Sequence, residues 1–271
     1  MNQSDIIQEK KRLIYYFLKR NYLNIKRKVI KVNQNPKFLF ILSPPYCGST
    51  LLNQLLSTSK NVSCNNELGT REGQLLPGVK HFMFQKNRWS KEVKYDWEII
   101  KNVWMKYWDQ SKPILLDKSI PNIMRVEEIK KVFTNTYFIC MVRNPYAQIE
   151  GIMRRNNTTA EYATDFTLKC LHYQRENIER EKNILFFTYE ELCEKEEQTI
   201  EKISKFLPEI KDIKANSKFK AHNFKTKSAM QIVNLNNEKI SKIDKTHLSI
   251  INQILLKEKE LLDYFNYNII Y

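Results

Sequence analysis

KFLFILSPPYCGSTLLNQLLS, residues 37–57, decides the fold of this chain. Phe38 to Leu42 is an unbroken apolar run, as in buried parallel strands, and the prolines at 44 and 45 end it. Gly48 then permits a tight reversal. Apolar residues next recur at helical spacing, at Leu51, Leu52, Leu55 and Leu56. The pattern predicts a strand, a sharp turn and the start of a helix.

A helix start of this kind favours an anionic ligand, because its first amides are unpaired and the helix dipole is positive there. The nucleoside-triphosphate loop G-x-x-x-x-G-K-[ST] is not matched. The residues around Gly48 are Tyr46, Cys47, Ser49 and Thr50, and the loop has no lysine. A tight turn without a ligand is the alternative at this point. The segment therefore predicts a cradle for a phosphate-like group.

Length and composition indicate one large domain. A chain of 271 residues, 42% of them hydrophobic, can bury a sizeable core. No flexible linker, low-complexity tract or internal repeat divides it. We expect a single domain over residues 1–271, with a helical N-terminal extension over 1–36 and a core over 37–271.

The cysteines and the apolar runs bear on location. Five cysteines without C-x-x-C spacing indicate neither a disulfide framework nor a zinc site, and they fit a reducing compartment. The apolar run from Leu13 to Leu18 lies between basic pairs and is too short for a signal peptide or a membrane span. We expect a cytoplasmic protein with no transmembrane segment and no metal.

A formal net charge of +15 suits nucleic acid, an anionic membrane or an anionic small ligand. Lysines are spread through the chain, and the densest basic stretch is a helical pattern from Asp5 to Lys28. A solvated helix face is favoured there over a membrane or nucleic-acid surface. We expect no nucleic-acid partner, and the sequence leaves open whether the chain forms a homodimer.

Apolar runs and helical patterns alternate along the chain in the βαβ rhythm of a parallel sheet. Such sheets bind ligands at the carboxyl ends of their strands. The residues that follow the strands are Tyr46 to Thr50, Asp117 to Ser119, Arg143 to Pro145 and Thr188 to Glu190. The runs are Phe38 to Leu42, Ile114 to Leu116, Tyr137 to Val142 and Ile184 to Phe187 for strands, and Ile123 to Phe133, Ala147 to Met153 and Glu190 to Phe206 for helices.

Three motifs together resemble sulfotransferases that use 3′-phosphoadenylyl sulfate: the P-x-x-G-[ST]-T loop, Val-Arg-Asn-Pro after the third strand, and Tyr-Glu-x-Leu. The resemblance implies an α/β, P-loop-like three-layer fold with a central parallel β-sheet flanked by helices. It implies that the loop holds the 5′-phosphosulfate and Arg143 the 3′-phosphate. The donor site so assigned is Pro45, Tyr46, Cys47, Gly48, Ser49, Thr50, Leu51, Arg143, Gly151 and Lys227.

The branch that the chain resembles most contains the tyrosylprotein sulfotransferases and related bacterial enzymes. NVSCNNELGTREGQLLP, residues 61–77, is similar to that branch's segment with the catalytic base, which falls on Glu67. Lys118 matches its strand-end lysine, and Arg71 is assigned to the substrate. The implied reaction moves a sulfuryl group by in-line displacement to a hydroxyl of a carbohydrate, a small molecule or a tyrosine, and leaves 3′-phosphoadenosine 5′-phosphate.

This sequence departs from the family at three points. Tyr46 stands where many members have a basic residue, so positive charge near the sulfuryl group would come from Lys118 and Arg71. Gly151 stands where the family often has a serine that contacts the 3′-phosphate, and Arg154 or Arg155 could substitute. The membrane anchor of the tyrosylprotein enzymes is not seen here, so their acceptor does not carry over.

Several alternatives stay open. In a nucleotide kinase or NTPase, Asp117 would bind magnesium, although the missing loop lysine argues against this. In a non-catalytic RNA-binding protein, the positive charge would form one stripe. His81 is the second candidate for the base. Trp97, Ile100, Trp104 and Trp108 repeat at helical spacing, and core packing is favoured for them over an acceptor-binding wall.

Overall fold

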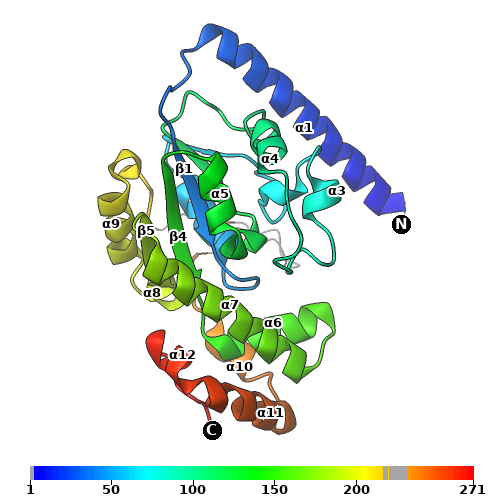
Figure 1. Ribbon diagram of the computed structural model, residues 1–271, viewed down its shortest axis with the longest axis vertical. Helices are drawn as coiled ribbons and strands as arrows, with labels where there is room; N and C mark the ends of the chain where they lie inside the picture. The colour runs from blue at the N-terminus through cyan, green and yellow to red at the C-terminus, as the bar shows by residue number, and fades with distance from the viewer. Residues whose placement is uncertain (1–2, 216–218, 220–230) are drawn as a thin grey trace.

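The computed structural model describes residues 3–215, 219 and 231–271 (Figure 1). Its centre is a parallel sheet with the strand order β2-β3-β1-β4-β5. β1 pairs with β3 on one side and β4 on the other, so the cradle that follows β1 lies in the middle of the sheet. The strands are β1 (Lys37–Leu42), β2 (Val62–Cys64), β3 (Ile114–Asp117), β4 (Thr136–Val142) and β5 (Ile184–Thr188).

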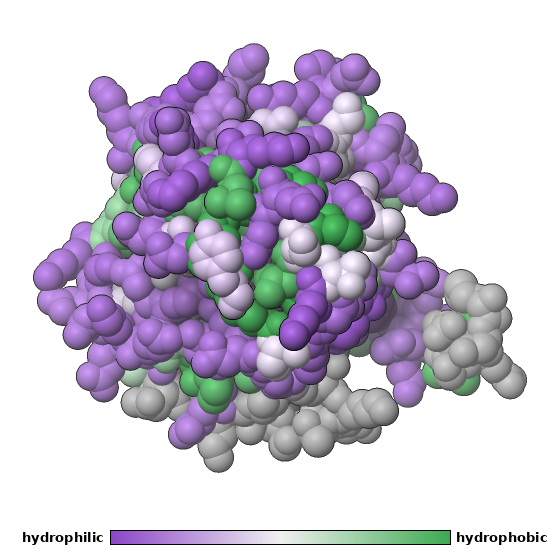
Figure 2. Space-filling model, turned by 90° about the horizontal axis from the view of Figure 1, so that it is seen from below, coloured by the Kyte–Doolittle hydropathy of each residue, from purple (hydrophilic) through white to green (hydrophobic). Residues whose placement is uncertain are grey.

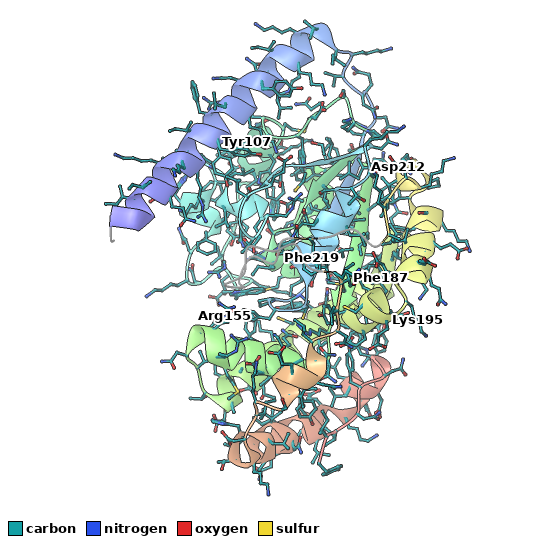
Figure 3. The ribbon with its side chains drawn as sticks, turned by 180° about the vertical axis from the view of Figure 1, so that it is seen from behind. Tyr107, Arg155, Phe187, Lys195, Asp212 and Phe219 are labelled. Atoms are coloured by element: carbon teal, nitrogen blue, oxygen red, sulfur yellow. The ribbon has the colours of Figure 1, made fainter. Side chains whose placement is uncertain are left out.

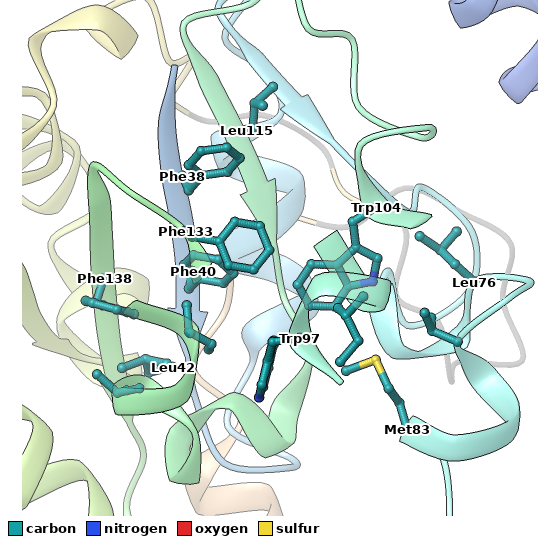
Figure 4. Packing of buried hydrophobic residues seen from close by; sticks show 14 of the residues in the cluster. Phe38, Phe40, Leu42, Leu76, Met83, Trp97, Trp104, Leu115, Phe133 and Phe138 are labelled. Carbon is teal, nitrogen blue, oxygen red and sulfur yellow. The ribbon is translucent and has the colours of Figure 1, made fainter. Parts of the chain in front are cut away.

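Both faces of β1 are buried, because a side-chain period of two sends neighbouring residues to opposite sides. Phe38 and Phe40 pack on one side with Trp104 and Phe133 (Figure 4). Leu39 and Ile41 pack on the other side in a second cluster. A sheet between two apolar layers is the three-layer α/β fold that the sequence predicts, and that prediction is confirmed.

Helices form the outer layers. α4, α5 and α7 supply side chains to the cluster around Phe40, and α2, α8 and α9 supply those around Ile41. The helices are α1 (Gln3–Val29), α2 (Ser49–Leu56), α3 (Lys80–Met83), α4 (Trp97–Trp104), α5 (Val126–Val132), α6 (Pro145–Asn156), α7 (Ala160–Arg180), α8 (Tyr189–Glu194), α9 (Glu196–Phe206), α10 (Asn236–Ile240), α11 (Lys245–Leu255) and α12 (Lys259–Tyr264), with 3₁₀ turns η1 (Gly73–Leu75), η2 (Ile120–Met124), η3 (Pro208–Ile210) and η4 (Leu256–Glu258).

The tryptophan stripe belongs to the core, as the sequence favoured. Trp97, Trp104 and Trp108 are 5%, 0% and 0% exposed, and α4 ends before the last of them. The indole of Trp104 donates to the carbonyl of Gly73, and that of Trp108 to the carbonyl of Leu116. A buried indole needs such a partner, so these residues fasten β3 and η1 to the core.

Two expected helices are broken. The pattern from Ile123 to Phe133 becomes η2 followed by α5, and the pattern from Glu190 to Phe206 divides at Lys195 into α8 and α9. A side-chain cap explains where α8 begins, because Thr188 and Glu191 form a capping box at its first turn.

The end of the molecule that is seen from below has a mixed surface. Seen from below, the end that carries the C-terminal helices is mainly hydrophilic, with hydrophobic side chains gathered near the middle (Figure 2). Within the ranges that the structure describes, no helix combines the length and the apolar character needed to cross a bilayer.

Candidate active site

The loop after β1 forms a cradle in front of α2. Gly48 has φ of 88°, a left-handed conformation that favours glycine. A Cβ atom here would lie 2.7 Å from the ring of Tyr189, so the close approach also requires glycine. No side chain among the described residues caps the start of α2. The first amides of Ser49, Thr50 and Leu51 are therefore directed at the loop, where an anion would meet them.

Cys47 lies in the loop but is not poised as a nucleophile. Its thiol is fully buried and contacts the amide oxygen of Gln148 at 3.3 Å. Burial raises the pKa of Cys47 to about 12, although Arg143 acts in the opposite direction. A neutral buried thiol is unreactive.

Arg143 follows β4 and lies under the loop. Its Nε donates to Oδ1 of Asn236 at 2.7 Å, and its Nη1 donates to the carbonyl of Tyr46 at 3.1 Å. The guanidinium stacks on the ring of Tyr189, 4.0 Å from the centroid. Its Nη2 is buried and has no hydrogen-bond partner among the residues that the structure describes. A buried donor without a partner is costly, so this atom fits an anionic ligand.

A network behind Arg143 fixes its direction. Asn236, at the start of α10, also donates to Glu190, the second residue of the Tyr-Glu-x-Leu segment. Glu190 accepts from the amide of Asn144 at 2.9 Å and from the hydroxyl of Tyr267 at 3.0 Å. Three separate parts of the chain thus hold the guanidinium in one orientation.

Lys239 on α10 is a basic residue of the site that the sequence did not single out. Its Nζ lies 3.0 Å from where a Cβ of Gly151 would stand. It contacts the carbonyl of Ala147 at 3.4 Å and the carboxylate of Glu150 at 3.8 Å. Burial and the charge of Arg143 lower the pKa of Lys239 to about 8. An ammonium group from another element therefore lies next to the open space that Gly151 leaves.

The other substitutes for that serine are differently engaged. Arg154 is paired with the buried Glu150 one turn earlier on α6. Arg155 lies in the last turn of α6 (Figure 3). Tyr46 has φ of 66°, and its side chain lies along Gly151, with its hydroxyl donating to Asn156 at 2.7 Å. Burial raises the pKa of Tyr46.

Lys118 follows β3 and is buried on the α2 side of the loop. Its Nζ donates to Oγ1 of Thr50 at 3.3 Å and to Oε1 of Glu72 at 3.1 Å. Lys118 and Glu72 are 2% and 5% exposed. The side-chain amide Nε2 of Gln74 donates to the other oxygen of Glu72. The buried carboxylate of Glu72 is thus connected to the cradle through Lys118. The sequence did not identify Glu72 as a site residue.

The side chains of Glu67 and Arg71 are engaged with helices, Glu67 with α1 and Arg71 with α2. Glu67 accepts from the hydroxyl of Tyr15 at 2.6 Å and pairs with Lys19 at 3.2 Å, both on α1. Burial would raise the pKa of Glu67, but Lys19 and Tyr15 hold it below its usual value. Arg71 donates to Asn53 of α2 and to Ser57, the residue that follows this helix.

Arg88 brings a further positive charge near Glu72 and Tyr46. Its guanidinium lies over the ring of Phe84, 4.5 Å from the centroid, and Nη1 donates to the carbonyl of Gln85 at 2.9 Å. Burial lowers the pKa of Arg88, while Glu72 raises it. Its Nε is buried without a partner in the described part of the chain.

Three further residues that the sequence proposed for the site are Asp117, His81 and Lys227. Both carboxylate oxygens of Asp117 accept from protein donors, namely Asn65, Gly73, Ser119 and Asn122, so this residue fastens loop to strand. His81 is exposed on α3 with its ring against Phe82. Lys227 lies outside the described residues. Within those residues, no group of three or more His, Cys, Asp or Glu side chains is placed to hold a metal ion.

Comparisons with known proteins agree with this architecture. A sequence model of the sulfotransferase family matches residues 36–210. A search of curated protein sequences finds no match. The sulfotransferase domain from the curacin biosynthetic pathway is 18% identical with a TM-score of 0.50, over 88% of this chain and 100% of that one. The sulfotransferase from Alicyclobacillus acidocaldarius is 10% identical with a TM-score of 0.51, over 87% of this chain and 98% of that one.

Proposed function

The chain belongs to the sulfotransferase family, and we propose that it transfers a sulfuryl group from 3′-phosphoadenylyl sulfate to an acceptor hydroxyl. The observation that carries the choice of donor is the buried Nη2 of Arg143, which has no partner in the described residues. An arginine fork that is held on two sides and open on the third matches a phosphate oxygen.

The two anionic ends of the donor would lie on either side of Tyr46. Arg143 and Lys239 would hold the 3′-phosphate, with Gly151 leaving room for the ammonium group. The amides from Gly48 to Leu51 would hold the 5′-phosphosulfate at the start of α2. In such a site Lys227 is also a candidate contact. We propose residues 1–271 as one sulfotransferase unit that works in the cytoplasm, where its five free cysteines stay reduced.

The proposed chemistry is a single in-line displacement. The acceptor oxygen forms a bond to sulfur while the bond from sulfur to the 5′-phosphate oxygen breaks, and a base takes the acceptor's proton. Lys118 stabilises the negative charge that builds on the leaving phosphate. The products are the sulfated acceptor and 3′-phosphoadenosine 5′-phosphate. The reaction uses no enzyme-bound intermediate, which agrees with the neutral thiol of Cys47.

The contacts favour Glu72 as the base, whereas the family resemblance favours Glu67, which stays a prediction. Glu72 reaches Thr50 of the cradle through Lys118, and the carboxylate of Glu67 is engaged with α1. Donor binding would draw Lys118 towards the phosphosulfate. A carboxylate oxygen of Glu72 would then lose its lysine partner and be open to a hydrogen bond from the acceptor hydroxyl.

A kinase function receives less support. Magnesium would need a strand-end carboxylate with a free oxygen, but both oxygens of Asp117 already accept from protein groups.

The acceptor is the open part of the proposal: a carbohydrate, a small alcohol or phenol, or a protein tyrosine. A mass-spectrometric screen with purified enzyme, donor and pools of each acceptor class would detect the gain of one SO₃. We expect one class to be modified only when donor is present. If the enzyme is folded but no pool shows donor consumption or a sulfated product, the proposed reaction is wrong.

A further inference from the structure

The outward face of α1 carries an apolar stripe that the rest of the described structure leaves uncovered. Ile7, Ile14, Leu18 and Ile25 are 49%, 59%, 60% and 64% exposed. Their spacings of seven, four and seven residues place them on one side of the helix. Exposed apolar side chains are common singly, but a row on one helix marks a contact surface.

The opposite face of α1 fixes this direction. Tyr16 and Leu23 are buried, and Tyr16 packs against Tyr107, which lies between α1 and the sheet (Figure 3). Lys26 pairs with Asp109 at 2.5 Å, and Lys19 donates to the carbonyl of Cys64 at 3.0 Å. Figure 1 shows α1 along the outside of the molecule beside α3 and α4. Rolling the helix to bury the stripe would break all these contacts.

The charges on α1 indicate what covers the stripe. The helix has eight lysine and arginine side chains and two acidic ones. Lys10, Lys11 and Lys28 are exposed and flank the apolar row. A second copy would bring a helix of the same charge, in a chain of net charge +15, so self-association along this face is opposed. An anionic lipid surface complements both features, since lysines extend to the headgroups while apolar side chains enter the interface.

The exposed apolar row departs from the solvated face that the sequence favoured for this helix. We propose that α1 binds the surface of an anionic phospholipid bilayer, lying in the plane of the interface. Its lack of transmembrane character agrees with lying on the membrane instead of crossing it. The inference is independent of the donor and of the base.

This placement also orients the enzyme. A cavity of 420 Å³ lies between α1 and the segment after Glu67, with Arg12, Leu13 and Thr70 in its wall. The carbonyl of Thr70 accepts from Thr50 of the cradle at 3.2 Å, so this cavity adjoins the proposed transfer site. Membrane binding through the outward face of α1 would hold that cavity one helix diameter, roughly 10 Å, from the headgroups, because Tyr16 on the inner face lines it.

Vesicle flotation of the full chain tests the proposal. We compare vesicles of phosphatidylcholine alone with vesicles that also contain phosphatidylglycerol. The wild type should float with the anionic vesicles, and added salt should weaken this binding. Ile14→Asp/Leu18→Asp should weaken it about 30-fold or more. Replacing Lys10, Lys11 and Lys28 by glutamine should cost about fivefold per lysine and flatten the salt dependence.

The matched control is Ile99→Asp/Leu256→Asp, because these side chains are 47% and 46% exposed on other elements. It should bind vesicles like the wild type. Circular dichroism and binding of 3′-phosphoadenosine 5′-phosphate check that each variant is folded. The proposal is overturned if the folded stripe variant still floats like the wild type, or if the control loses binding equally. It is also overturned if the wild type is a dimer through α1 and the stripe variant is a monomer. Displacement of the wild type from the vesicles by RNA would overturn it as well.

Discussion

Lys239→Met should make the ligand-free protein more stable and its nucleotide binding weaker. Burial and Arg143 lower the pKa of Lys239 from 10.5 to about 8. That difference corresponds to at most about 3 kcal/mol of unfavourable charge burial, since one pKa unit equals 1.36 kcal/mol. Methionine fills a similar volume without the charge. We expect a gain of about 1 to 3 kcal/mol in the free energy of unfolding at neutral pH.

The pH dependence of this gain has a definite sign. Between about pH 8 and 10.5 the unfolded chain keeps the proton on Lys239 and the native protein releases it, so wild-type stability rises with pH there. Below about pH 8 both states hold the proton and the whole cost is present. Urea denaturation of both proteins should show a stability difference that is largest at neutral pH and shrinks towards pH 10.5.

Binding supplies the second half of this test. Losing one charge-assisted contact of about 1.5 to 3 kcal/mol should weaken 3′-phosphoadenosine 5′-phosphate about 10- to 150-fold. Adenosine 5′-phosphosulfate, which lacks the 3′-phosphate, should bind almost as before. The matched control is Lys242→Met, an exposed lysine that pairs with Glu238. If Lys239→Met destabilises the protein, or leaves both nucleotides bound with wild-type affinity, the reasoning is wrong.

Three further changes probe the site. Glu72→Gln should lower turnover about 10²- to 10⁴-fold in steady-state kinetics, with the donor affinity nearly unchanged. If Glu67→Gln abolishes turnover and Glu72→Gln has only a mild effect, Glu67 is the base. Gly48→Ala should abolish donor binding in calorimetry and cost about 1 to 3 kcal/mol of stability, because it is strained at φ of 88° and meets Tyr189; wild-type binding would refute the cradle. His81→Gln should leave kcat/KM within about threefold of wild type, because the ring is exposed on α3, and a large loss would make it the base.

Long apolar runs made the sheet predictable. The runs at Phe38, Ile114, Tyr137 and Ile184 each became a strand of the central sheet. β2 was not predicted, because its three residues at the sheet edge give too short a pattern to separate from a loop.

The site was predictable only where the chemistry follows a strand. Arg143 and Lys118 come directly after β4 and β3, and the structure brings both to the loop. Lys239 and Asn236 come from a segment far along the chain, and one lysine among many carries no signal in the sequence. Gly151 was the available clue, since a missing side chain leaves room for a group from elsewhere.

Glu72 was overlooked for a different reason. A single glutamate in a polar segment is ordinarily solvated, so its sequence neighbours do not predict burial. Its burial depends on Lys118, which lies 46 residues away. Tertiary contacts, and not local pattern, decide which carboxylate of the segment faces the cradle.

Calorimetric titration of wild type and Arg143→Ala with 3′-phosphoadenosine 5′-phosphate, in the presence of a chelator, tests the central claim most directly. The proposed site predicts micromolar binding by the wild type that the chelator does not change. It predicts a loss of about 10- to 150-fold in the variant, with adenosine 5′-phosphosulfate hardly affected. Absent binding, binding that the chelator abolishes, or equal losses for both nucleotides would contradict it.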